Sequence, residues 1–313
     1  MTPPPVQQSR SPGAVRLFEV AGISVYLHWT WGVVALILLS TRNNVYQSQI
    51  WNVLEYLSIF AIVLMHEFGH AFACRSVGGR AERILLWPLG GVAYVSPPRR
   101  PGALLWSIAA GPLVNVALVP PTVILAYFSQ SVFPSADADL YQFIDMVATI
   151  NLILLIFNML PIYPLDGGQI VHAILWFFMG PWRSLNVAAC IGLVGAAGVL
   201  VLALINRDFW FVFLAFFGIT RSLEGMRQAR GLKGMLQRPR HEFARCPICR
   251  EAPPLGALWR CRCGQVFDTF AQAGRCPRCG ESNAVTMCPL CGEMSSTDRW
   301  GMIRSEAAVA PYG

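Results

Sequence analysis

Long apolar stretches alternate with short polar segments over the first two thirds of the chain. An α-helix needs about 20 apolar residues to cross the hydrocarbon core of a membrane. Six stretches reach or approach this length: residues 23–39, 57–74, 104–128, 144–160, 185–205 and 209–220. The last is short, so it requires the flanking Arg207 and Arg221 to extend toward water. The pattern predicts an α-helical polytopic membrane protein with about six transmembrane helices.

Two further apolar segments do not fit a simple span. Residues 84–94 hold two extended runs around Pro88 and a pair of glycines, which predicts a membrane-associated β-hairpin. Such backbone is tolerated at membrane depth only beside protein or a water-filled cavity. Residues 169–179 are too short to cross a bilayer, so we expect a half-helix or an interfacial helix there.

Composition and charge support this membrane body. Of the 313 residues, 55% are hydrophobic and 13% are charged, whereas a soluble domain carries roughly 25% charged residues. Most of the basic residues behind the net charge of +7 lie beside spans or in the C-terminal part. A cytoplasmic N-terminus puts most span-flanking Arg and Lys on one side, as the positive-inside rule requires. We therefore expect a multi-pass cell-membrane protein with both termini cytoplasmic, in contact with the lipid bilayer and not with nucleic acid.

The second predicted span carries His66-Glu67-Phe68-Gly69-His70, an H-E-x-x-H motif. On a helix, positions i and i+4 share a face, so both imidazoles can bind one Zn²⁺ while Glu67 acts as general base on a water. The alternative is a buried polar cluster satisfied by neighbouring helices or lining a transport path. Polar and charged side chains inside a span are costly and mark functional sites, which favours a catalytic zinc centre.

A catalytic zinc has three protein ligands and keeps a fourth position for water. Asp166 is the prominent acidic candidate for the third ligand, because it follows the fourth predicted span where prolines and glycines break the helix. A plain helix-capping role is the alternative for this carboxylate. Both motifs lie at the same depth, so we expect Asp166 to complete the site.

Four motifs, in this order, resemble the site-2 protease family of intramembrane zinc metalloproteases. They are H-E-x-x-H at 66–70, P-L-G-G-V at 88–92, A-G-P-L-V-N at 110–115 and N-x-x-P-x-x-x-L-D-G-G at 158–168. The resemblance covers roughly residues 15–225. It implies the ligand and base roles given above, and it also implies that Asn115 and Asn158 hold the substrate backbone or the developing oxyanion. For Asn115, interhelical hydrogen bonding is an equally good interpretation.

The resemblance also implies a function. The chain would hydrolyse peptide bonds of membrane-spanning protein substrates, in regulated intramembrane proteolysis. A zinc or proton transporter is one alternative, but it predicts further carboxylates within the spans, and the sequence offers few. An inactive membrane scaffold is the other, and the intact Glu67 argues against it.

Eight of the ten cysteines lie near the C-terminus, and four thiolates satisfy one structural zinc, so we expect two such sites there. The segment resembles a double zinc ribbon, although the one-residue gap between Cys261 and Cys263 departs from the usual spacing. A reducing cytoplasm disfavours disulfides. Sequential pairing is our first interpretation, with interleaved pairing open: Cys246, Cys249, Cys261 and Cys263 for one ion, and Cys276, Cys279, Cys288 and Cys291 for the other.

These features divide the chain into five segments. We expect a disordered lead (1–15), an intramembrane metalloprotease domain (16–225), a linker (226–245), a zinc-ribbon-like domain (246–300) and a tail (301–313). Together the predicted ligands require three zinc ions, one catalytic and two structural. The small zinc-stabilised domain has no candidate base, so we expect it to bind a cytoplasmic partner or to regulate the protease.

Overall fold

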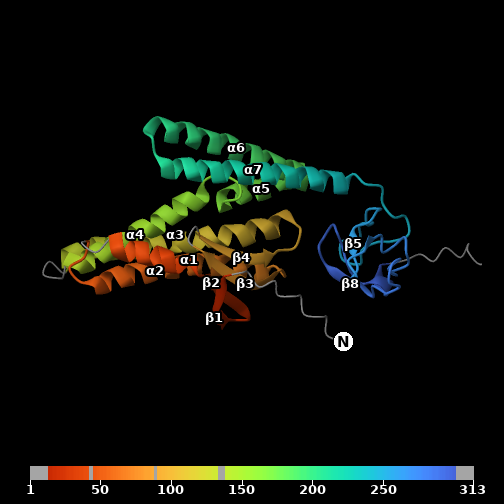
Figure 1. Cartoon of the computed structure of the whole chain (residues 1–313), viewed down its shortest axis with the longest axis horizontal. Helices are drawn as coiled ribbons and strands as arrows, with labels where there is room; N and C mark the ends of the chain where they lie inside the picture. Colours follow the sequence, from red (N-terminus) through yellow and green to blue (C-terminus); the bar gives the residue numbers. More distant parts are fainter. Residues whose placement is uncertain (1–12, 42–44, 88–89, 133–137, 301–313) are drawn as a thin grey trace, which may run out of the picture. The chain divides into compact units, whose positions relative to one another are not determined.

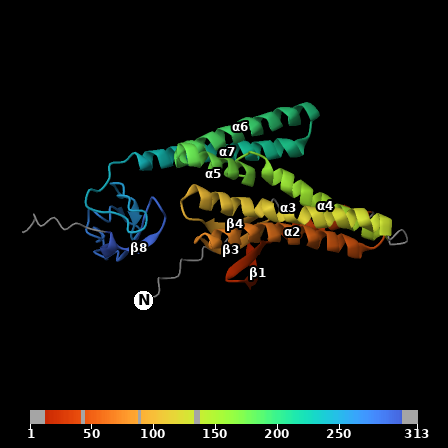
Figure 2. The same cartoon turned by 180° about the vertical axis from the view of Figure 1, so that it is seen from behind.

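The structure, a computed structural model, describes residues 13–41, 45–87, 90–132 and 138–300. The chain separates into two compact units, Met1–Met226 and Arg227–Gly313, and each is considered by itself (Figures 1 and 2). The first is helical with one small sheet, and the second consists of short strands and turns around clustered cysteines. The predicted fold class is confirmed. Most of the expected lead and the tail at 301–313 lie outside the described residues.

Five helices are long and apolar enough to cross a membrane within the described part of the chain, which makes this a multi-pass membrane protein. They are α2 (Gln49–Ser76), α3 (Pro101–Val132), α4 (Ala138–Met159), α6 (Pro181–Asn206) and α7 (Phe209–Leu236). Two shorter helices are α1 (Thr30–Thr41) and α5 (Asp166–Met179). Because α7 continues to Leu236, the first half of the segment predicted as a linker is helical.

The prediction of a helical span at residues 23–39 is wrong. The segment divides into a strand, β2 (Ile23–His28), and the 12-residue helix α1. Ile23 and Val25 are buried in the sheet, where their branched side chains suit a strand. A run of apolar residues is compatible with a buried strand as well as with a helix, which is why one such run concealed two elements.

The predicted hairpin is confirmed and belongs to a larger sheet. Four strands lie in the order β1 (Ala14–Val20), β2, β3 (Arg80–Trp87) and β4 (Gly90–Ser96). β2 runs parallel to β3, whereas β3 and β4 form an antiparallel pair with Ile84 opposite Ala93. The hairpin turn at Pro88 and Leu89 lies outside the described residues. β4 is therefore an edge strand, and it packs against α2.

Helix α2 is the central element of the first unit, because α3, α4 and the β3–β4 hairpin all pack on it. Its N-terminus is fixed from another helix: Asp139 accepts hydrogen bonds from the backbone N–H groups of Gln47 (2.9 Å) and Ser48 (3.0 Å). Trp31 of α1 packs edge-on against Tyr56 and Phe60 in the middle of α2. These contacts define the position of the helix that carries the H-E-x-x-H motif.

The second unit contains two small hairpins, β5 (Trp259–Arg260) with β6 (Val266–Phe267) and β7 (Val285–Met287) with β8 (Met294–Ser296). A short 3-10 helix (Thr297–Arg299) follows β8. Asp268 joins the loops by accepting from the Gly256 N–H (2.7 Å) and by pairing with His241 (3.0 Å). Burial alone would raise the pKa of Asp268, but these bonds and the Ala271 N–H hold that pKa below its usual range.

Candidate active site

Three side chains from two elements converge on one point in the first unit. His66 and His70 lie one turn apart on α2, and their Nε2 atoms are 3.1 Å from each other. Asp166 is the first residue of α5, and its Oδ2 lies 3.0 Å from His66 Nε2 and 3.4 Å from His70 Nε2. All three side chains are buried. The structure thus brings together the three residues that the sequence predicts as ligands.

The far nitrogen of each imidazole is hydrogen-bonded, which determines the tautomer. His66 Nδ1 donates to Asn115 Oδ1 (2.6 Å), and His70 Nδ1 donates to the backbone oxygen of Ser107 (2.9 Å). Both acceptors lie on α3. With Nδ1 protonated, each neutral ring presents the lone pair of Nε2 toward Asp166, as metal-binding histidines do.

The atoms fit a metal ion. A tetrahedral zinc with bonds of about 2.1 Å separates its ligand atoms by about 3.4 Å, close to the three distances found here. Asp166 Oδ2 is buried and makes no hydrogen bond within the described residues, although it lies beside both rings. A buried carboxylate oxygen left in this state is costly, and a cation at this point would satisfy it.

Glycine leaves the space that such an ion needs. A Cβ on Gly111 of α3 would lie 2.3 Å from His70 Nε2 and 2.9 Å from His66 Nε2. Real Cβ atoms essentially never approach other atoms so closely, so any side chain here would enter the point where the ligands meet. Gly111 lies within the motif at 110–115, but the sequence alone did not indicate this role.

Glu67 lies beside the three ligands and is held by the sheet. Its Oε2 accepts a hydrogen bond from the backbone N–H of Ala93 in β4 (2.7 Å). A Cβ on Gly91 would come within 2.5 Å of Glu67 Oε1, so this glycine allows the strand to approach the carboxylate. Glu67 is not among the three clustered ligands. Its position suits a proton acceptor at the edge of the metal centre.

The two asparagines implied by the resemblance have different surroundings. Asn115 is fully buried; besides its bond to His66, its Nδ2 donates to Asn151 Oδ1 (2.8 Å). Asn151 returns a bond to the Asn115 backbone oxygen (3.1 Å). Asn158 is half-buried and makes no hydrogen bond within the described residues. The geometry favours the interhelical interpretation of Asn115 and leaves Asn158 available to another molecule.

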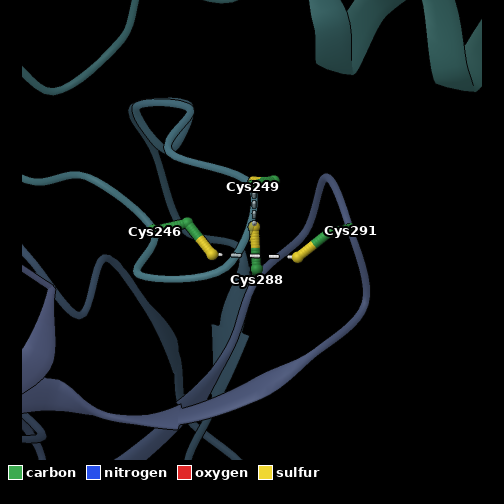
Figure 3. Close-up of side chains that lie close together, drawn as sticks. All are labelled: Cys246, Cys249, Cys288 and Cys291. Carbon is green, nitrogen blue, oxygen red and sulfur yellow. Dashed lines mark hydrogen bonds between the residues drawn. The ribbon is translucent and has the colours of Figure 1, made fainter. Parts of the chain in front are cut away.

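The eight C-terminal cysteines form two groups of four. In one group, shown in Figure 3, the sulfurs of Cys246 and Cys291 are 3.7 Å apart and those of Cys249 and Cys288 are 3.8 Å apart. In the other group the corresponding separations are 3.5 Å for Cys261–Cys279 and 3.7 Å for Cys263–Cys276. A disulfide would require about 2.05 Å. Zn–S bonds of about 2.3 Å in a tetrahedron separate sulfurs by about 3.8 Å, so both groups fit zinc.

Our first interpretation of the pairing, in sequential order, is wrong. The first and last pairs form one group, and the two middle pairs form the other, nested between them. A long-range contact accompanies this pairing: the N–H of Arg245 donates to the backbone oxygen of Trp300 (2.8 Å), which brings together the two ends of the cysteine-containing segment. The one-residue gap between Cys261 and Cys263 is accommodated in the nested group.

The fold and the site together define a class, the membrane proteins with a buried H-E-x-x-H motif that could hold a metal ion. Residues 55–202 match the family model for peptidase family M50, and this range contains His66, Glu67, His70 and Asp166. The part of the chain that holds these four residues is therefore similar to a peptidase M50 domain.

The proteins similar to this chain include two curated relatives and one solved structure. A zinc metalloprotease of Methanocaldococcus jannaschii is 34% identical over 206 residues, 65% of this chain and 58% of that protein. Stage IV sporulation protein FB of Bacillus subtilis is 30% identical over 62% of this chain and 64% of its own length. The solved site-2 protease from M. jannaschii covers 68% of this chain and 95% of that one, with 28% identity and a TM-score of 0.49. The chain thus spans about three fifths of the two curated relatives.

Proposed function

We propose that this protein is an intramembrane zinc metalloendopeptidase that hydrolyses membrane-anchored protein substrates, in regulated intramembrane proteolysis. The observation that carries the proposal is the convergence of His66, His70 and Asp166 on one point, with Glu67 beside them. The names of the relatives support the same chemistry. A transporter or a scaffold would not require a carboxylate placed beside a complete ligand set.

The residues have distinct roles in this proposal. His66 Nε2, His70 Nε2 and Asp166 Oδ2 would hold the ion, and bound zinc supplies the Lewis acidity that polarises a peptide carbonyl and activates water. Glu67 Oε2 is engaged by Ala93, so Oε1 is the atom that takes the proton from the attacking water. The same carboxyl group then delivers this proton to the leaving amine. Asn115 orients His66 and does not contact the substrate, whereas Asn158 is the asparagine that would bind the substrate backbone.

The sheet offers a route by which a substrate reaches the base. A helical peptide must unwind before its backbone can be cleaved, and an extended peptide can then pair with an edge strand. β4 is such an edge, and the Ala93 N–H on it is directed at Glu67. A substrate segment that lies along β4 would therefore place a backbone carbonyl near the metal centre.

Metal removal tests the function directly. Purified full-length protein in liposomes is expected to lose cleavage of a co-reconstituted membrane-anchored substrate after chelation, and to regain it with Zn²⁺ but not with Mg²⁺, which prefers oxygen ligands. The matched Asp166→Asn protein retains both cysteine groups but should stay inactive when zinc is returned. Full cleavage by protein shown to be free of metal would contradict the proposal.

We also propose that the cysteine groups hold two structural zinc ions, for three ions in the chain. Nested pairing then predicts metal counts that sequential pairing does not. Cys246→Ser with Cys291→Ser should remove one zinc per chain, because both belong to one group; Cys246→Ser with Cys261→Ser should remove two. Elemental analysis of the full-length variants gives the count, and the opposite ranking would restore sequential pairing. A cytoplasmic partner for this unit stays a prediction.

We propose that the chain crosses the membrane six times, with both termini in the cytoplasm. β2 and α1 in series extend about 20 Å and about 18 Å, together close to the roughly 42 Å of α2. Because β2 lies beside β3 and α1 begins opposite Tyr56, the two elements follow the length of α2 and supply the first crossing.

Accessibility labelling tests this topology. Single tags before Gly13 and after Gln237 should react only from the cytoplasmic side, while tags after Asn43 and after Gln130 should react only from the outer side. Reaction of the tags before Gly13 and after Asn43 from the same side would show that β2 and α1 do not cross.

A further inference from the structure

The turn before Asp166 is enclosed by α6 and α7. This turn, residues 160–165, links α4 to α5, and its Ile162 and Tyr163 lie against glycines of the other two helices. The two helices run side by side and meet near these positions (Figure 1). We call this surface the glycine groove; it is lined by Gly192 and Gly195 of α6 and by Gly218, Ser222 and Gly225 of α7.

The groove holds the turn closely because most of the residues that line it are glycines. A Cβ on Gly192 would lie 2.8 Å from the backbone nitrogen of Tyr163 and 2.9 Å from Ser222 Oγ. A Cβ on Gly225 would lie 3.0 and 3.1 Å from two atoms of the Tyr163 ring. The atom that a Cβ on Gly192 would meet is a backbone nitrogen, which cannot move aside as the end of a flexible side chain can. Added volume at Gly192 must therefore displace the turn.

Hydrogen bonds fix the turn on its other sides. Ser222 Oγ donates to the Tyr163 backbone oxygen (3.3 Å), and Gln169 Nε2 donates to the Pro164 oxygen (2.8 Å). A Cβ on Gly168 would lie 2.5 Å from the Tyr163 nitrogen, so α5 also begins in direct contact with the turn. The backbone of Tyr163 is thus held between three helices.

Asp166 depends on this turn for its position. Its Oδ2 makes no hydrogen bond within the described residues, and the contacts of this atom are those with His66 and His70 at the candidate metal site. The carboxylate must nevertheless stay 3.0 to 3.4 Å from two imidazole nitrogens. Functional groups of this kind are effective only when held within about 0.5 Å by the residues behind them.

We propose that the glycine groove positions the third metal ligand, with Gly192 and Ser222 as positioning residues for Asp166. The inference rests on the metal site of the proposed function and extends it. The predicted ligands all lie within residues 55–202, but the groove reaches to Gly225, beyond the matched range. α7 therefore contributes to a centre to which it supplies no ligand.

Zinc affinity of full-length, detergent-purified protein tests the proposal. The zinc that is present in wild type but missing from the Asp166→Asn protein is the ion at this site. This difference separates it from zinc in the cysteine groups. Gly192→Ala should weaken binding of that ion by about 10- to 100-fold in competition with a chromophoric chelator, as removal of supporting contacts does at other sites. Gly198→Ala is the matched control: it lies on the same helix with nothing within 4 Å of its Cβ, and it should bind as wild type.

Two further measurements separate positioning from general packing. Ser222→Ala adds no volume and should weaken binding by up to about fivefold while the helix content and elution volume stay unchanged. Co²⁺ substitution should show an altered visible spectrum at this site in Gly192→Ala. Wild-type zinc affinity in a folded Gly192→Ala protein would overturn the positioning role. Equal zinc content in wild type and Asp166→Asn would instead overturn the metal site itself.

Discussion

Replacing Glu67 by glutamine is expected to lower peptide hydrolysis by about 10²- to 10⁴-fold, the usual contribution of a general base. Glutamine has nearly the same volume, and its side-chain oxygen can still accept the bond from Ala93 N–H, so the side chain should stay in place. It cannot take up a proton from water. Zinc content should be unchanged because Glu67 is not a ligand in the cluster.

Glu82→Gln is the matched control, since Glu82 is an exposed glutamate on β3 and away from the ligand cluster. It should cleave a membrane-anchored substrate at the wild-type rate. Cleavage at the wild-type rate by Glu67→Gln would contradict the proposed mechanism. Loss of zinc from that variant would show that Glu67 binds the metal.

A second large loss of hydrolysis is expected when one methyl group is added at Gly111. Gly111→Ala places a Cβ about where the ion must lie, since this atom would be 2.3 Å from His70 Nε2. The variant should lose the catalytic zinc, and hydrolysis should fall to the level of a chain without His66. Helix α3 should persist, because alanine favours helix over glycine by about 1 kcal/mol.

Gly102→Ala serves as the control on the same helix. Its Cβ would meet Phe177 at 3.8 Å, an ordinary contact, so zinc content and activity should stay at wild-type levels. Each variant adds one methyl group to α3, and only the one at Gly111 enters the point where the candidate ligands meet. A Gly111→Ala protein with full zinc and full activity would mean that the ligands meet elsewhere.

The i, i+4 spacing of His66 and His70 was sufficient to predict the two candidate ligands on α2, because helix geometry alone puts both residues on one face. Asp166 was also predictable, since an acidic residue at a broken span end has few other uses. Its exact support was not predictable. Ser222 and Gly225 lie more than fifty residues from Asp166, and no local pattern connects a glycine on one helix to a turn between two others.

Two other features could not be predicted from the sequence: the direction in which a buried polar side chain points, and the pairing of residues that lie far apart in the chain. A polar residue in an apolar helix does not reveal which neighbour it faces, so the sequence left substrate binding and interhelical hydrogen bonding equally open for Asn115 and did not indicate Asn151 as its partner. The cysteine pairing is accompanied by the contact between Arg245 and Trp300, which brings together residues more than fifty positions apart. The span at 23–39 failed for a different reason, because an apolar run indicates burial and not helicity.

The continuity of α7 links two parts of the chain that carry clustered candidate metal ligands. The helix contacts the turn before Asp166 through Ser222 and runs without a break to Leu236, within the second unit, which begins at Arg227. If the glycine groove positions Asp166, a shift of α7 would change the zinc affinity of the proposed centre. Thermodynamic reciprocity then requires that zinc bound at that centre favour one position of α7 by the same factor.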